Sequence, residues 1–206
     1  MTDLFESKAE DWDKGDMKQM LSQAIGGAMV QKVAFQPQHH VMDFGAGTGL
    51  ICSAIAPHVQ SIAAVDISPA MLERLAAKPE LQGKVTTVCQ DILDCPIVNK
   101  SDERFDVIVS AMAMHHVQDT DAMLQSFYDH LKESGSVALA DLDAEDGSFH
   151  PENIEGVFHD GFDRSELQSK LERVGFQDVH FDTVTTVYKD NKAYPIFMVM
   201  ASRGKP

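Results

Sequence analysis

Short apolar runs alternate with amphipathic segments along the chain, and this alternation constrains the fold more than any other feature. The apolar runs predict five strands, at residues 40–44, 60–65, 84–88, 105–110 and 136–142. Helical spacing of apolar residues predicts helices at residues 49–56, 68–78, 121–132 and 163–175. Strands and helices that alternate in this way form a mostly parallel sheet with helices on both faces.

The chain closes on two further apolar stretches, residues 179–189 and 193–202, which are separated only by "DNK". A connection this short joins antiparallel strands, so we expect a β-hairpin. The predicted fold is therefore a mostly parallel, doubly wound α/β sheet of seven strands that ends in an antiparallel hairpin. With 206 residues, 44% of them hydrophobic, the chain is expected to form one domain over residues 1–206.

Acidic residues outnumber basic ones by 32 to 17, which gives a formal net charge of −15. Such a surface repels phosphate backbones, which argues against DNA or RNA and is compatible with neutral or cationic small molecules, although solubility alone also explains it. The three cysteines match neither a zinc site nor a C-x-x-C pair, and no metal is expected. No apolar run could span a membrane and no signal peptide is evident, so we expect a cytoplasmic protein.

A glycine-rich stretch, "VMDFGAGTGL", follows the first predicted strand. Gly45, Gly47 and Gly49 allow positive φ and the close approach of a ligand, although a tight strand-to-helix turn would also use glycine. In open α/β sheets ligands bind beyond the carboxyl ends of the strands, where this loop lies. The spacing differs from the G-x-G-x-x-G pattern of dinucleotide loops.

Two carboxylates follow the next two strands. Asp66 comes 21 residues after Gly45, where an acid can bind both ribose hydroxyls of an adenosine, and Ile67 can lie against the adenine. Asp91, followed by Ile92, can accept a hydrogen bond from the adenine amino group, although it could also be an ordinary loop acid. Together these residues favour an adenosine ligand.

Asp43 lies two residues before Gly45. A carboxylate there would repel a pyrophosphate, whereas a ligand that carries an ammonium and a sulfonium would tolerate it. This argument favours S-adenosylmethionine over NAD, although Asp43 could instead brace the loop by accepting hydrogen bonds from backbone N–H groups.

The ordered set "VMDFGAGTGL", "AVDIS", "CQDIL", "FDVIVSAMAMHHV" and "LKESGSVALADLD" resembles the class I S-adenosylmethionine-dependent methyltransferases. The resemblance is greatest to the small-molecule branch related to ubiquinone and menaquinone methyltransferases, and it runs from about Phe5 to Ser202. It implies a Rossmann-like sheet of seven strands in the order 3-2-1-4-5-7-6, with the last strand antiparallel. It also implies an N-terminal helical lid over residues 1–35, opened by "FESKAEDWD", in which Trp12 closes over the cofactor, although Trp12 could simply pack an N-terminal helix.

The resemblance also implies roles for single residues. Gly45, Ala46 and Gly47 would pack against the methionine part of the cofactor, and Ser110 and Ala111 would lie by its amine. Asp66 would hold the ribose, Ile67 would stack on the adenine, and Asp91 with Ile92 would contact the adenine edge.

The acceptor of the methyl group is expected to be a small molecule. His115 and His116 follow the fourth strand, so either could act as a base or orient the acceptor. The segment 143–162 would build the acceptor pocket, with His116, His150, Phe158 and His159 as substrate residues and Phe149 and Phe162 adding aromatic lining. It could equally be a loop that packs its own aromatic side chains. The oligomeric state is left open.

Three alternatives compete with this interpretation. Tyr128 and Lys132 match the Y-x-x-x-K pair of short-chain dehydrogenases, but the glycine spacing does not fit that family. A methyltransferase-like fold could bind the nucleoside without transferring a methyl group, as a regulator or partner subunit. The segment "SAMAM" lacks the proline–aromatic motif of many amino-methylating nucleic-acid enzymes, which disfavours DNA as the substrate.

Overall fold

The computed structural model describes residues 6–9, 12–97, 104–151 and 154–204. Its centre is one sheet of seven strands in the order β3-β2-β1-β4-β5-β7-β6. The strands are β1 (His40–Phe44), β2 (Ser61–Asp66), β3 (Val85–Cys89), β4 (Phe105–Ala111), β5 (Leu131–Leu142), β6 (Phe176–Lys189) and β7 (Lys192–Arg203). Neighbours from β3 to β5 pair in parallel, and β7 is antiparallel to β5 and to β6. The predicted order and the antiparallel last strand are confirmed.

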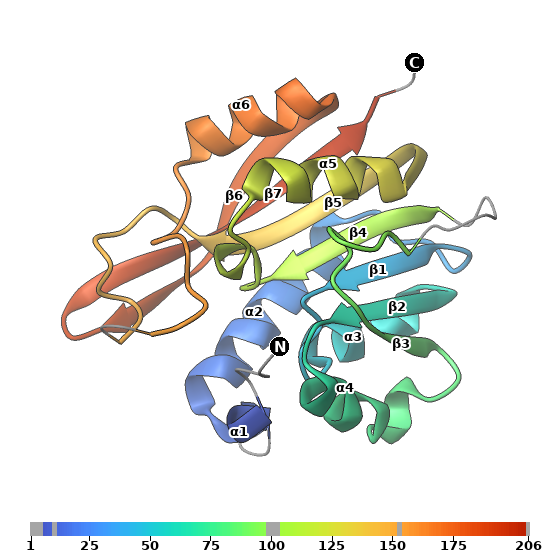
Figure 1. Cartoon of the computed structure of the whole chain (residues 1–206), viewed down its shortest axis with the longest axis horizontal. Helices are drawn as coiled ribbons and strands as arrows, with labels where there is room; N and C mark the ends of the chain where they lie inside the picture. Colours follow the sequence, from blue (N-terminus) through green and yellow to red (C-terminus); the bar gives the residue numbers. More distant parts are fainter. Residues whose placement is uncertain (1–5, 10–11, 98–103, 152–153, 205–206) are drawn as a thin grey trace.

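Helices cover both faces of the sheet (Figure 1). The α-helices are α1 (Glu6–Ala9), α2 (Asp16–Lys32), α3 (Leu50–Ile55), α4 (Pro69–Ala76), α5 (Thr120–His130) and α6 (Arg164–Val174). The 3-10 turns are η1 (Trp12–Lys14), η2 (Ala56–His58), η3 (Pro79–Leu81) and η4 (Met114–His116). Apolar side chains of α2, α3 and α4 share one core cluster with the sheet, and those of α5 and α6 share the other.

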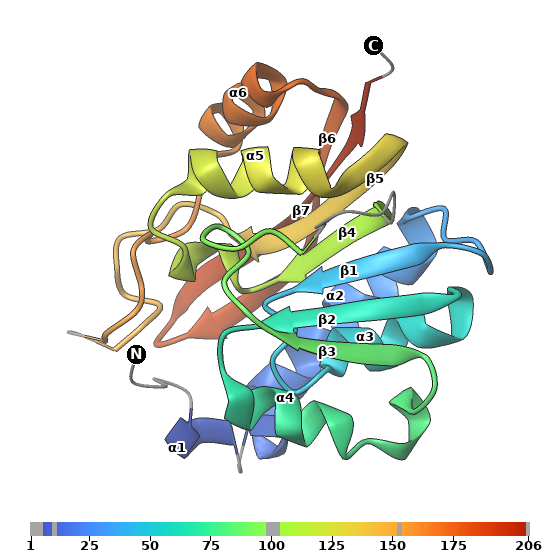
Figure 2. The same ribbon diagram turned by 45° about the vertical axis from the view of Figure 1, so that its right-hand side comes forward.

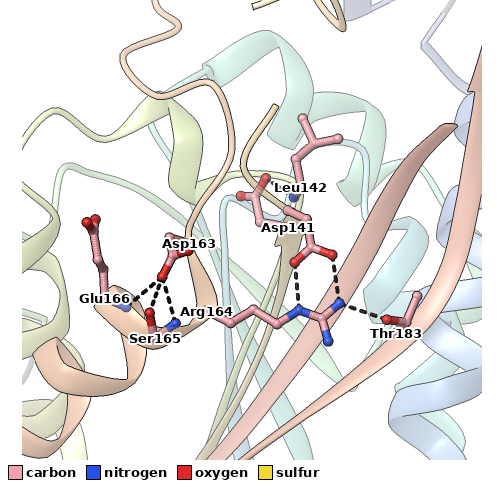
Figure 3. A network of polar contacts seen from close by, with 8 residues as sticks. Asp141, Leu142, Asp163, Arg164, Ser165, Glu166 and Thr183 are labelled. Carbon is pink, nitrogen blue, oxygen red and sulfur yellow. Dashed lines mark hydrogen bonds and ion pairs between the residues drawn. The ribbon is translucent and has the colours of Figure 1, made fainter. Parts of the chain in front are cut away.

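Helix ends follow the local sequence. The Ser68 side chain accepts a hydrogen bond from Met71 N at 3.2 Å, and the following Pro69 has no N–H to satisfy, so α4 begins there. Asp163 caps α6 through Ser165 N and Glu166 N, as Figure 3 shows. Gly175 ends α6 in the left-handed conformation, at φ +116°.

The helix that precedes β1 contains a pair of glycines in its middle, Gly26 and Gly27. Glycine is a poor helix former, but here it permits close packing. A Cβ added at Gly26 would lie only 2.8 Å from Ala54 Cβ on α3. Gly26 therefore lets α2 and α3 approach each other on one face of the sheet.

The largest difference from the predicted boundaries lies between α5 and β5. The helix was expected to end at Lys132 and the strand to begin at Ser136, whereas α5 ends at His130 and β5 begins at Leu131. Leu131 pairs with Phe105 before the register between β4 and β5 shifts. After Leu131 the start of β5 reads "KESGS" and carries positive φ at Ser134 (+64°), so no apolar alternation marks it in the sequence.

Two segments from distant parts of the chain meet at the carboxyl ends of the parallel strands. Figures 1 and 2 both show the N-terminal segment and the connection from β5 to α6 at the arrowhead end of β1, β2 and β4. Residues that follow those strands therefore face residues from these two segments.

Candidate active site

The turn after β1 depends on its glycines. Gly45, Gly47 and Gly49 have φ of +69°, +52° and +83°, values that residues with a Cβ rarely adopt. A Cβ at Gly45 would lie 2.3 Å from Ala113 Cβ, whereas a Cβ at Gly47 would meet no atom within 4 Å. Gly45 therefore permits contact with the segment after β4, and Gly47 keeps backbone exposed in open space.

Asp66, the last residue of β2, is bonded to this turn. Its Oδ2 accepts a hydrogen bond from Gly47 N at 2.8 Å, and its Oδ1 accepts one from Ser68 N at 2.9 Å. One carboxylate thus connects the glycine turn to the start of α4. Because Ser68 caps α4 itself, Asp66 is not required for that role.

Two cavities meet over the glycine turn. The first cavity lies over the ends of β1, β2 and β4, and the second lies between the turn, α2 and the segment after β5. Both are lined by Trp12, Gly45, Gly47, Met112 and His116, so they form one cleft.

Most residues expected at the site line this cleft. In the first cavity, Asp66, Ile67 and Asp91 accompany the shared residues, and Ile67 is 57% exposed there. The second cavity adds Ala46, Ala111, His115, His150 and Phe149.

Three residues expected at the cofactor lie beneath the cleft. Ser110 is fully buried and donates a hydrogen bond to Phe44 O at 2.9 Å. Ile92 is 1% exposed and belongs to the core cluster on the α5 and α6 face. Asp43 is 1% exposed and accepts a hydrogen bond from Cys52 Sγ at 3.0 Å. Neither cavity is lined by any of the three.

Burial dominates the electrostatics of Asp43. The pKa of this carboxyl is raised to about 7, chiefly because the group is removed from water; the hydrogen bond from Cys52 lowers the pKa and the charge on Asp66 adds to the increase. Burial and the nearby Asp43 raise the pKa of the Cys52 thiol well above its usual value, so it stays protonated and can donate.

Behind the second cavity lies a buried histidine–carboxylate pair. His115 Nδ1 lies 2.7 Å from Asp141 Oδ1, and the two side chains are 2% and 0% exposed. Asp141 also accepts hydrogen bonds from His115 N at 3.2 Å and Leu142 N at 2.8 Å. The end of β5 therefore fixes the ring that follows β4.

Two further imidazoles complete a cluster. The ring centroid of His115 lies 4.1 Å from that of His116 and 4.9 Å from that of His150. Burial, followed by the neighbouring His115, lowers the pKa of His116 to about 4, and burial lowers the pKa of His150 as well. Both rings are therefore neutral at pH 7. His116 Nδ1 donates to Gly156 O, which fixes that ring to the segment after β5.

The segment 143–162 divides between the cleft and other surroundings. Phe149 and His150 line the second cavity, whereas Phe158 is 52% exposed and lines neither cavity of the cleft. His159 Nε2 bonds to Val117 O at 2.9 Å and Thr120 Oγ1 at 3.2 Å, beside a separate shallow depression. Phe162 is 9% exposed and packs in the core. The structure therefore brings His116 and His150 together but places Phe158 and His159 elsewhere.

The N-terminal segment is attached to the glycine turn. Trp12 lines both cavities, and the Lys18 ammonium lies 3.3 Å from the centroid of its ring. Asp13 Oδ1 accepts a hydrogen bond from Thr48 Oγ1, and Asp13 Oδ2 lies 2.9 Å from Lys78 Nζ. Phe5, which opens the expected lid motif, lies outside the described residues.

The sequence analysis missed Asp141 and the Asp13 contacts. Asp141 interrupts an otherwise apolar strand, "SVALADL", and a carboxylate inside a buried strand requires a partner. That signal marks Asp141 but does not identify His115, because the two come from different strands. Within the described ranges, no cluster of three or more His, Cys, Asp or Glu could hold a metal ion, and no helix is long and apolar enough to cross a membrane.

The comparisons with known proteins agree with this architecture. The family described as "Methyltransferase domain" matches residues 41–135. An uncharacterized methyltransferase of Schizosaccharomyces pombe is 30% identical over 133 residues, covering 59% of this chain and 47% of that protein. A ubiquinone biosynthesis O-methyltransferase of Coxiella burnetii is 28% identical over 142 residues, covering 67% of this chain and 59% of that protein. The chain therefore matches only about half to three-fifths of the length of these relatives.

Solved structures share the fold. A Haloferax volcanii protein solved with the Trm112 methyltransferase activator gives a TM-score of 0.79 at 17% identity, with 100% of both chains covered. Phosphoethanolamine N-methyltransferase 2 of Haemonchus contortus, in complex with S-adenosyl-L-methionine, gives 0.72 at 14% identity and covers 98% of this chain and 60% of that one. The sheet order, the site and these matches define a Rossmann-like methyltransferase fold. Over residues 41–135 the chain matches the methyltransferase domain family, and in fold it resembles the class I S-adenosylmethionine-dependent methyltransferases.

Proposed function

We propose that this protein binds S-adenosylmethionine in the cleft over the glycine turn and transfers its methyl group to a small-molecule acceptor. The observation that carries the proposal is that Asp66, Asp91 and the bare backbone at Gly47 face one cavity. Among the solved structures of this fold, the Haemonchus contortus enzyme was determined with S-adenosyl-L-methionine.

The residues of the first cavity fit an adenosine. Asp66 offers carboxylate oxygens at a position fixed by two backbone N–H groups, which suits the two ribose hydroxyls. Ile67 is a large apolar side chain left 57% exposed beside it, and an adenine ring would cover that surface. Asp91 lines the same cavity and can accept from the adenine amino group.

The methionine part of the cofactor would extend from the first cavity into the second. Gly45, Ala46 and Gly47 present backbone there, and Ala111 lies at the end of β4. Asp43, beneath the turn, supplies negative charge for the ammonium when it is ionised. Trp12 would cover the cofactor from the N-terminal segment.

Bound S-adenosylmethionine would supply an electrophilic methyl carbon on a sulfonium. The chain's own residues then need to hold an acceptor in line with that carbon and keep water out. Trp12, Phe149 and the apolar side of α2 surround the second cavity and can do both. The ubiquinone O-methyltransferase among the relatives supports a small-molecule acceptor.

Two alternatives are less well supported. Tyr128 packs edge-on against Phe176 at 5.3 Å between centroids and under the Arg203 guanidinium at 4.4 Å. This tyrosine does not line the cleft, so the Tyr128–Lys132 pair offers no support for an oxidoreductase. A nucleoside-binding role without transfer is not favoured, because the second cavity provides room for an acceptor beside the first.

Thermal denaturation with S-adenosylhomocysteine, compared with NAD, tests the cofactor assignment. A ligand at about 100 times its Kd adds about 2.7 kcal/mol of stability, which raises Tm by roughly 5–11 °C at this size. Asp66→Ala should weaken S-adenosylhomocysteine binding roughly 100-fold, because two charge-assisted hydrogen bonds of about 1.5 kcal/mol each are lost. Exposed Asp94→Ala is the matched control. Stabilisation by NAD alone, or unchanged affinity in Asp66→Ala, would refute the assignment.

A further inference from the structure

The His115–Asp141 pair has the geometry of a base held by a carboxylate. Both oxygens of Asp141 accept backbone N–H bonds, from His115 N and Leu142 N, so this carboxylate is surrounded by donors. The ring nitrogen His115 Nδ1, 2.7 Å from Oδ1, donates to it as well. In a neutral imidazole with its hydrogen on Nδ1, the Nε2 atom carries a lone pair that can accept a proton.

That lone pair has a place to act. His115 lines the second cavity, and among the described residues Nε2 has no hydrogen-bond partner. Enzymes commonly remove a proton from a weakly acidic nucleophile with a base whose orientation is fixed by a third group. A buried histidine–carboxylate pair that served stability alone would not need to face a cavity.

The charges around the second cavity restrict the acceptor. Its described lining contains no Asp or Glu, so a cationic acceptor would find no counterion there. Lys18 is the one Lys or Arg in the same described lining, which is too little for a phosphorylated acceptor. His116 and His150 are neutral at pH 7 because burial lowers the pKa of each.

The cavity also offers one unsatisfied polar atom. His150 Nε2 is buried and has no hydrogen-bond partner among the described residues, and the ring lies against Phe149 at 5.0 Å between centroids. Phe149 and Trp12 provide aromatic walls. A flat, uncharged molecule with one or more hydroxyl groups would satisfy the orphaned nitrogen and cover the aromatic surfaces.

We propose that His115 removes the proton from a hydroxyl group of an uncharged aromatic acceptor, and that Asp141 is the residue that positions it. This inference rests on the proposed methyl transfer. The hydroxyl proton passes to Nε2, and an oxygen lone pair forms the O–CH₃ bond as the C–S bond breaks and its electron pair stays on sulfur. The products are an aryl methyl ether, S-adenosylhomocysteine and a His115 imidazolium paired with Asp141. The imidazolium then releases its Nε2 proton to solvent.

The position of the proton is tested without turnover. In ¹H–¹⁵N NMR of the wild-type protein, the His115 ring is expected to carry its hydrogen on Nδ1. The signal of that hydrogen should lie downfield, because Nδ1–H donates to the Asp141 carboxylate. Asp141→Asn should abolish that signal while S-adenosylhomocysteine still raises Tm. A hydrogen on Nε2 in the wild type would overturn the assignment.

The second test uses phenols of different acidity with radiolabelled S-adenosylmethionine. The panel contains phenol, 4-methoxyphenol and catechol, with 4-nitrophenol as an acceptor that ionises without help, and aniline and thiophenol as acceptors without a hydroxyl. His115→Ala should lower kcat for the neutral phenols by roughly 10²-fold or more, with much less effect on 4-nitrophenol, and added imidazole should restore part of the rate. His150→Leu should mainly raise KM. Exposed His58→Ala is the control.

Each result has one meaning. Equal losses for neutral and ionised phenols in His115→Ala, with S-adenosylhomocysteine binding intact, would overturn the base. Methylation of aniline or thiophenol alone, or of no phenol while S-adenosylhomocysteine still binds, would overturn the acceptor class and leave the cofactor assignment standing. Failure of the wild-type protein to bind S-adenosylhomocysteine would overturn both proposals.

Discussion

Asp43→Asn should make the protein's stability less sensitive to pH. Asp43 is a carboxyl with 1% exposure, and burial raises its pKa to about 7 from an ordinary value of 3.8. The folded protein therefore holds a proton there that the unfolded chain has released. Asp43 contributes its full stability below pH 3.8, and that contribution is lost as the pH rises through about 7. Asparagine keeps an acceptor for Cys52 but has no proton to lose.

The magnitude follows from the pKa difference. Each pKa unit corresponds to 1.36 kcal/mol, so full ionisation of Asp43 in the folded protein costs about 4 kcal/mol. About 2.6 kcal/mol of this loss falls between pH 5 and pH 8. At roughly 2–4 °C per kcal/mol, Tm of the wild type should fall some 5–10 °C further than Tm of Asp43→Asn over that interval.

Urea denaturation at pH 5 and pH 8 measures this difference directly. The amide introduced by Asp43→Asn brings donors that the carboxyl lacks, but their cost does not depend on pH and cancels in the comparison. Exposed Asp94→Asn controls for the change in net charge. Wild-type and Asp43→Asn stabilities that change in parallel between the two pH values would show that Asp43 is ionised in the folded protein throughout, and would refute the reasoning.

The remaining predictions concern the turn and the segment after β5. Gly45→Ala should lower Tm and weaken S-adenosylhomocysteine binding in calorimetry, because its Cβ would lie 2.3 Å from Ala113 Cβ. Gly83→Ala, at φ +77° with no atom within 4 Å, should cost only about 1 kcal/mol, and equal losses in both variants would contradict the packing argument. Arg164→Met removes the two 2.7 Å bonds to Asp143 and should cost roughly 1 kcal/mol while increasing hydrogen exchange after β5. Unchanged exchange there would show that the pair does not hold this segment.

Local signals were sufficient for most of the fold. Alternating strands and helices predicted the sheet, and the three-residue connection before β7 predicted its antiparallel end. Ser68 and Asp163 marked helix starts because capping depends on neighbouring residues alone. The start of β5 was missed because its pairing to β4 is irregular there, and a tertiary contact rather than an apolar pattern determines it.

The candidate site was less accessible to sequence reasoning. Motif spacing placed Asp66 and Asp91 in one cavity, because both follow neighbouring parallel strands. His159 and Phe158 could not be placed, since the path of a long connection depends on contacts such as the one between Arg164 and Asp143. Figure 3 shows the Arg164 guanidinium with its bond to Thr183. The pairing of His115 with Asp141 depends on the β4–β5 register.

The double attachment of Asp66 links affinity to local folding. Gly47 N and Ser68 N hold both oxygens before any ligand arrives, so no side-chain rotamer needs to be ordered there on binding. The same bonds make the carboxylate's position depend on the glycine turn. Substitutions that loosen the turn should therefore shorten ligand residence time even where Asp66 itself is unchanged.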